Sequence, residues 1–156
     1  MTMSSSATRA CTAATVVSRL IDVTESVVYK TTRPLEPAGL SLPQYHVLRI
    51  LRDAQPEGLL VHEVGDRMVA RAPNITRLVD KLEKKALVNR TRSDSDRRTV
   101  RLAITSQGLE LLEALDGPME AAVARAIGAL SDEDLDHLGS LLERVHDSTR
   151  GTRRQS

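Results

Sequence analysis

Aromatic residues are almost absent from this chain of 156 residues, which has two Tyr and neither Trp nor Phe. Its core must therefore consist of Leu, Val, Ile and Ala, a composition that suits helices packed on helices. Hydrophobic residues make up 40% of the chain, which is enough for a core. At this length we expect one domain, with or without helical extensions.

Other absences exclude further classes of protein. The single Cys, Cys11, cannot form an intramolecular disulfide, so nothing indicates an oxidising compartment. No apolar run approaches the ~20 residues of a membrane span, and the N-terminus lacks the apolar segment of a signal peptide. We therefore expect a soluble, cytoplasmic protein with no membrane partner.

Motifs for catalysis and for cofactors are missing as well. The chain has no Gly-rich phosphate loop and no nucleophile elbow. The four His residues are scattered and lack the close Cys/His spacing of a metal site. We predict that the protein is not an enzyme and that it holds no cofactor and no metal.

Positive charge, in contrast, is concentrated in residues 71–101. This stretch has ten Lys or Arg and four Asp or Glu, a net charge of +6, whereas the whole chain is only +1. Residues 106–150 have ten acidic and three basic residues, a net charge of −7. Such clustering is typical of a phosphate-binding surface, although a solvated basic face without a partner has the same composition.

The basic stretch has the periodicity of a helix followed by a hairpin. Apolar residues recur at i, i+3, i+4 and i+7, the stripe of an amphipathic helix: Ile75, Leu78, Val79 and Leu82. After Leu87 the period becomes two, which predicts two strands around a polar tip at residues 93–98. A basic helix followed by a basic-tipped hairpin is the layout of a winged helix-turn-helix.

The predicted fold is mainly α (α+β). We expect a disordered N-terminus at residues 1–8, a helical dimerisation region at 9–33 and 106–150, and a winged helix-turn-helix DNA-binding domain at 40–105. Ser41 with Gln44, and Ser131, have the pattern of helix N-caps, and a short strand is expected at 59–61. The Asp116-Gly117-Pro118 sequence predicts a kink or a short break.

The flanking helices indicate a homodimer. Each has its own Leu/Val/Ala stripe outside the winged-helix core, and large exposed apolar patches are unusual in monomers. A two-fold interface would bury these stripes and present two recognition helices to successive major grooves about 34 Å apart. The alternative is a monomer whose extra helices cover its own core.

The sequence resembles the multiple-antibiotic-resistance regulator (MarR) family of bacterial winged-helix repressors. The resemblance covers about residues 40–108. It depends on Leu42-Pro43-Gln44-Tyr45-His46-Val47-Leu48, on the run from Asn74 to Lys85 with Leu87-Val88, and on Asp94-x-Asp96-Arg97-Arg98 leading into Leu102-x-Ile104-Thr105-x-x-Gly108. It implies a homodimer that binds a palindromic operator and is released by a small ligand or an oxidant.

The resemblance also assigns residues to the double-stranded DNA partner. Asn74, Thr76 and Arg77 would face the major groove, and Arg98 would enter the minor groove from the wing with help from Asp96. We expect the full set of DNA-binding residues to be Arg71, Asn74, Thr76, Arg77, Lys81, Asp96, Arg97 and Arg98. Two alternatives stay open: Asn74 caps the helix instead, and Asp80 forms an i,i+4 pair with Lys84.

Two positions depart from the family pattern. Ala86 stands where the family has Gly, and an Ala in the left-handed conformation costs on the order of 1 kcal/mol, so a different helix end is expected here. Ala72, before Pro73, is a poor N-cap. Both departures concern the geometry of the DNA-reading helix rather than the fold.

Release from DNA has two candidate triggers. The family's small-molecule effector pocket would here be lined by Tyr29, Tyr45, His46 and Arg49. Alternatively Cys11, at the start of the first helix, is the thiol of a redox sensor, which requires a lowered pKa and access to oxidant. A winged helix used only as a protein-interaction module is the remaining alternative.

Overall fold

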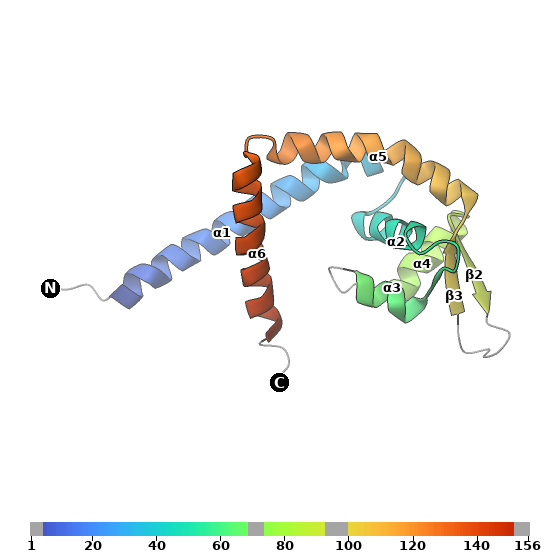
Figure 1. Cartoon of the computed structure of the whole chain (residues 1–156), viewed down its shortest axis with the longest axis horizontal. Coiled ribbons are helices and arrows are strands. Elements are labelled where there is room, and N and C mark those ends of the chain that lie inside the picture. Colours follow the sequence, from blue (N-terminus) through green and yellow to red (C-terminus); the bar gives the residue numbers. More distant parts are fainter. Residues whose placement is uncertain (1–4, 69–73, 93–99, 152–156) are drawn as a thin grey trace.

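A computed structural model describes residues 5–68, 74–92 and 100–151. In these ranges the chain contains, in order, α1 (Ser5–Thr32), η1 (Arg33–Leu35), α2 (Leu42–Arg52), β1 (Leu59–Leu60), α3 (Val61–Arg67), α4 (Ile75–Lys84), β2 (Val88–Arg92), β3 (Val100–Ile104), α5 (Ser106–Ile127) and α6 (Asp132–Gly151). Helices α2 to α4 and the small sheet form a compact lobe, from which the long helices α1, α5 and α6 extend (Figure 1).

The sheet is antiparallel, with strand order β1-β3-β2. Leu59 of β1 lies opposite Leu102 of β3, and Val88 of β2 lies opposite Ile104. The turn into β1 requires glycine, because Gly58 has φ +67° and a Cβ there would lie 2.3 Å from the Leu102 carbonyl oxygen. The winged helix-turn-helix and the short first strand are therefore as predicted.

The core is aliphatic, as the scarcity of aromatic residues predicts. Val47, Leu48, Leu51, Val64, Val79, Leu82 and Leu102 are completely buried, and Tyr45 is the one aromatic side chain in the buried core of the described residues. The predicted apolar stripe of α4 faces the core: Val79 and Leu82 are buried, while Ile75 and Leu78 are partly buried against it. The opposite face of α4 is thereby left on the surface.

Side chains cap the helices that follow turns. The Ser41 backbone N–H donates to Gln44 Oε1 (2.9 Å) at the start of α2, and Ser131 Oγ accepts from the Asp134 N–H (3.2 Å) at the start of α6. The hydrogen bond from the Ser131 hydroxyl lowers the pKa of Asp134. Both predicted N-caps are confirmed.

Two expectations about where the long helices begin or break were wrong. Helix α1 begins at Ser5, so residues 5–8 are helical rather than disordered; this segment has no Gly or Pro and includes Ala, the strongest helix former. Helix α5 continues through Pro118, which contradicts the short break, while the kink that was its alternative stays a prediction. Pro118 is exposed, while Leu115 and Met119 beside it are buried, so packing outweighs the one lost backbone hydrogen bond.

An ion pair fixes α5 to the winged-helix lobe. Arg52 Nη1 at the end of α2 donates to Asp116 Oδ2 at 2.7 Å, and this hydrogen bond raises the pKa of Arg52.

Among the described residues no helix is both long and apolar enough to span a bilayer.

Candidate nucleic-acid interface

One exposed row of α4 carries unpaired cations. Arg77, Lys81 and Lys84 lie at i, i+4 and i+7, so they share one stripe of the helix. All three are exposed, and within the described ranges none forms an ion pair or a side-chain hydrogen bond. These cations are free to attract phosphates.

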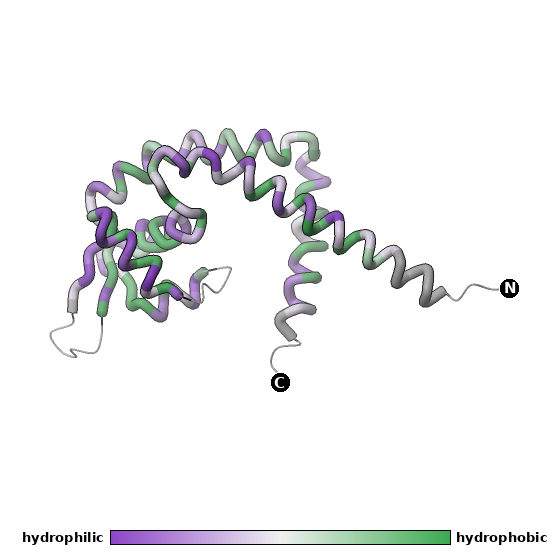
Figure 2. Tube along the Cα trace, turned by 180° about the vertical axis from the view of Figure 1, so that it is seen from behind, coloured by the Kyte–Doolittle hydropathy of each residue, from purple (hydrophilic) through white to green (hydrophobic). Residues whose placement is uncertain are grey.

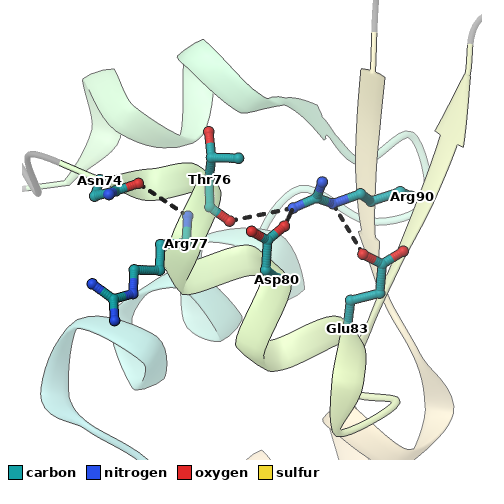
Figure 3. A network of polar contacts seen from close by, with 6 residues as sticks. All are labelled: Asn74, Thr76, Arg77, Asp80, Glu83 and Arg90. Atoms are coloured by element: carbon teal, nitrogen blue, oxygen red, sulfur yellow. Dashed lines mark hydrogen bonds and ion pairs between the residues drawn. The ribbon is translucent and has the colours of Figure 1, made fainter.

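Asn74 is the N-cap of α4. Its Oδ1 accepts a hydrogen bond from the Arg77 backbone N–H at 3.2 Å (Figure 3), and the helix begins at Ile75. Asn74 therefore caps the helix, and Ala72, which was expected to be the N-cap, does not have that position; the base contact assigned to Asn74 stays a prediction. Because the cap uses only the carbonyl oxygen, the Asn74 amide group keeps its two N–H donors.

The next two side chains point outward from the first turn of α4. Thr76 and Arg77 are both exposed, and the Arg77 guanidinium extends away from the neighbouring ion-pair cluster (Figure 3). Side chains at the N-terminus of a recognition helix are those that reach base edges in the major groove. The positions assigned to Thr76 and Arg77 are thus compatible with base contact.

Three other basic residues of the stretch are bound within the protein. Lys85 Nζ donates to the carbonyl oxygens of Ala38 (3.0 Å) and Gly39 (2.7 Å). Arg101 Nη1 donates to the carbonyl oxygens of Glu57 (3.2 Å) and Gly58 (3.1 Å). Both side chains are exposed, so their charges still belong to the basic surface, although backbone carbonyls hold them in place.

Arg90 is the third of these residues. It forms ion pairs with Asp80 and Glu83 of α4, so the expected pairing of Asp80 with Lys84 is wrong. The signal was present in the sequence, because Val88 and Arg90 are two residues apart on β2 and share the face that packs on α4.

Helix α4 ends in the left-handed conformation despite the absence of glycine. Ala86 has φ +58°, its N–H donates to Glu83 O (2.8 Å) and the Leu87 N–H donates to Leu82 O (3.0 Å). These two hydrogen bonds define a Schellman motif. The expectation that Ala86 would change the helix end was wrong, since the paired carbonyls and the burial of Leu87 outweigh the strain.

Several of the predicted DNA-binding residues lie outside the described residues. These are Arg71, before α4, and the wing-tip residues Asp96, Arg97 and Arg98. The side chain of Cys11 also lies outside them, although its backbone belongs to α1.

Three of the four residues expected to line an effector pocket lie close together on α2, and the fourth lies apart on α1. The Arg49 guanidinium lies 5.9 Å from the centre of the buried Tyr45 ring, and the His46 ring is 6.1 Å from it. Burial, with the positive charge of Arg49, lowers the pKa of His46. Tyr29, by contrast, is exposed on α1.

A hollow of about 400 Å³ lies between the end of α1 and α5. Its lining is Lys30, Arg33, Pro34, Ala122 and Arg125, and none of the four expected residues belongs to it. The volume is in the range of small-molecule sites. Within the described part of the chain, no three His, Cys, Asp or Glu side chains are grouped to hold a metal ion.

Comparison with known proteins identifies similar chains. The MarR family model matches residues 40–100. The HTH-type transcriptional regulator MhqR of Bacillus subtilis is 33% identical over 107 residues, which is 69% of this chain and 72% of MhqR. The crystal structure of a MarR transcription factor from Planctomyces limnophilus is 35% identical, with a TM-score of 0.67, and covers 82% of this chain and 93% of its own.

A second similar structure is that of BpsR from Bordetella bronchiseptica, whose DNA binding is regulated by 6-hydroxynicotinic acid. Its TM-score is 0.75 at 21% identity, over 85% of this chain and 93% of BpsR. At this identity the likeness concerns the fold.

Proposed function

We propose, from the premise that this chain belongs to the MarR family of winged helix-turn-helix transcriptional regulators, that it represses transcription as a homodimer on a palindromic operator. A small ligand would release it from that operator. DNA binding and transcriptional regulation belong to the family. The two-fold dimer on a palindromic operator, repression rather than activation, and release by a ligand are what we propose.

The observation that carries the proposal is the exposed row of Arg77, Lys81 and Lys84 on a helix whose opposite face is anchored in the core. The two lysines are suited to phosphate contacts, which determine position and affinity. Arg77 and Thr76, nearer the helix start, are suited to base edges: Arg to guanine O6 and N7, and a Thr methyl to the thymine methyl. Arg71, Asp96, Arg97 and Arg98 remain predicted members of the same surface.

The homodimer is supported by apolar side chains that the monomer leaves in water. They lie on the long helices, at Val16, Val17, Ile21, Val23, Val28, Tyr29, Val123, Leu138, Leu141, Leu142 and Val145, and in the turn between α5 and α6, at Leu130. Figure 2 shows hydrophobic positions repeated along α1 and α6, away from the winged-helix lobe. A two-fold interface between these helices would bury them and orient two α4 helices for one duplex.

Ligand release is supported by the position of the hollow between α1, η1 and α5. Its walls belong both to the long helices and to η1, the segment that leads into the winged-helix lobe. A molecule bound there would act on the angle between the two parts, as a ligand must in order to favour one of two conformations. BpsR is an example of a similar fold with a small-molecule effector.

The central test is selection of bound sequences from random duplex DNA by the full-length protein. We expect a pseudo-palindrome whose half-sites are about one helical turn apart. Affinity for the recovered duplex should fall steeply, by about a thousandfold or more, between about 50 mM and 200 mM salt if six or more phosphates are contacted. Recovery of no sequence, with no salt-dependent binding, would favour a protein-interaction module instead.

A further inference from the structure

Arg90 lies across the surface of the recognition helix. Its Nη2 donates to Asp80 Oδ1 and to the Thr76 carbonyl oxygen at 3.3 Å, and its Nε lies 3.2 Å from Glu83 Oε2 (Figure 3). The three acceptors are at i, i+4 and i+7 of α4, so one guanidinium from β2 contacts nearly two turns of the helix. We name this cluster of Thr76, Asp80, Glu83 and Arg90 the wing clamp.

Burial indicates that Arg90 is committed to the clamp rather than to a ligand. Its side chain is 26% exposed, whereas those of Asp80 and Glu83 are 48% and 45% exposed. The Nε atom is buried and makes no aligned hydrogen bond among the described residues, so Glu83 acts on it through charge. A phosphate contact would require this guanidinium to leave two carboxylates and a carbonyl.

The chemistry of the clamp requires arginine. A planar guanidinium with five N–H donors can serve a carboxylate and a carbonyl at the same time, while a lysine ammonium is a single point on a flexible stem. The clamp also alters the electrostatics of α4, because Arg90 offsets one of the two negative charges that the helix would otherwise present beside DNA.

The position of the clamp shows what it fixes. The Schellman turn at Lys85–Leu87 joins the end of α4 directly to β2, which is one attachment point between helix and strand. Through Arg90, β2 is attached again at Thr76 and Asp80, toward the start of the helix. These two separated attachments, one at the buried Leu87 and one on the exposed side of α4, set the angle between α4 and the β2–β3 hairpin.

We propose that Arg90 is a positioning residue for sequence recognition, which acts through the wing clamp to hold α4 and the hairpin at the angle that lets both contact one operator. The inference rests on the proposed use of α4 and the wing in DNA reading. It gives Asp80, an acidic residue on a DNA-facing helix, a favourable role. It also removes Arg90 from the phosphate-binding residues.

The test compares Arg90→Gln, Arg90→Lys and Asp80→Asn with a matched control, Lys84→Gln, which removes an exposed and unpaired cation from the same helix. Affinity is measured for the duplex recovered by selection and for an unrelated duplex. We expect Arg90→Gln to weaken operator binding by at least about tenfold while binding to the unrelated duplex changes less than about threefold. Arg90→Lys should restore little of the loss.

Asp80→Asn separates the clamp from simple charge effects. Removing a negative charge near DNA should strengthen binding to every duplex if only charge matters. The clamp predicts weaker operator binding instead. Lys84→Gln should weaken both duplexes alike and lower the dependence of log affinity on log salt by about 1. The inference is overturned if Arg90→Gln behaves like Lys84→Gln, or if Asp80→Asn strengthens operator binding.

A measurement on the free protein keeps this test independent of the proposed function. If the clamp exists, the Asp80→Asn change should lower the midpoint of urea unfolding in the natural chain and have little effect once Arg90 is Gln. Additive effects would overturn the clamp even if an operator is found. Coupled effects, together with undiminished operator binding by Arg90→Gln, would also overturn the positioning role, leaving a clamp without a part in recognition.

Discussion

At the scale of single residues, the most informative position is the end of the recognition helix. Ala86 adopts the left-handed conformation that the family's pattern assigns to Gly, and it does so within two backbone hydrogen bonds of a Schellman motif. A Cβ in this conformation is strained by roughly 1–2 kcal/mol. The natural chain therefore holds strain at the junction between its reading helix and its wing.

Replacing Ala86 with Gly should relieve this strain. We expect a gain in the free energy of unfolding of about 0.5–1 kcal/mol, since the added freedom of Gly in the unfolded chain offsets part of the relief. Urea denaturation at fixed protein concentration measures the change. Ala103→Gly, at a strand position with ordinary φ, is the control and should destabilise; destabilisation by Ala86→Gly as well would contradict the strain.

His46 gives a pH dependence. Burial and the charge of Arg49 lower its pKa in the folded protein, so the unfolded chain takes up a proton at about pH 6.5 where the folded chain does not. The contribution to stability is complete above that pH and decreases as the pH falls toward the lowered pKa.

The midpoint of urea unfolding should thus be lower at about pH 5.5 than at about pH 7.5. His46→Gln should reduce this difference, whereas the exposed His137→Gln on α6 should leave it unchanged. An equal pH effect in the natural chain and in His46→Gln would assign the dependence to other groups.

At the scale of elements, hydrophobic periodicity was sufficient to predict a helix or strand wherever one of its faces is buried. The apolar stripe of α4 and the alternation of β3 were correctly predicted because Val79, Leu82, Leu102 and Ile104 all enter one core. Pro118 shows the limit, since local rules predicted a break and the buried residues around it keep α5 continuous. Tertiary packing, which no single segment contains, decides such cases.

The sequence correctly placed the exposed cations of the candidate site on α4, but it did not predict which basic side chains bind other parts of the protein. Arg77 and Lys81 are exposed on α4 as expected, yet Lys85, Arg90 and Arg101 form hydrogen bonds within the subunit. Their acceptors are distant in sequence or are backbone carbonyls, whose direction depends on the folded chain. Charge clustering therefore located the surface, and it counted in excess only Arg90, whose charge two carboxylates compensate.

The wing gives a prediction at this scale. Arg98→Ala should weaken operator binding by more than about 1 kcal/mol, because an arginine in a narrow A·T minor groove gains from its negative potential. The measurement is a titration of the selected duplex at physiological salt, with circular dichroism to show that the fold is intact. Unchanged affinity would remove Arg98 from the interface.

At the scale of the whole molecule, the arrangement of α1 and α6 is the main feature. Both carry large apolar side chains in water; α1 extends away from the winged-helix lobe, and α6 descends from the far end of α5, separate from that lobe (Figure 1). The proposed two-fold association would bury these side chains. Sequence patterning predicted the apolar stripes, and the exposed residues of the single chain support the inference about what covers them.

Leu141 on α6 provides a test of that association. Leu141→Asp should raise the Kd of the dimer by at least about a hundredfold, since a symmetric interface loses two Leu contacts of about 1.5–3 kcal/mol each. Gly139→Asp adds the same charge on the opposite face of α6, where no atom of the described residues, apart from the backbone of α6 itself, lies within 4 Å of the new Cβ. Sedimentation over a concentration series distinguishes them, and equal behaviour of the two variants would place α6 outside the interface.

The two hydrogen bonds from Lys85 to Ala38 and Gly39 have a mechanical consequence. They join the C-terminal end of α4 to the segment that follows η1, so a displacement of that segment would act on α4 as well as on the long helices. In the proposed two-fold dimer the same displacement would occur in both subunits, related by the two-fold rotation. It would change the distance between the two α4 helices, and with it the spacing of half-sites that the dimer can bind.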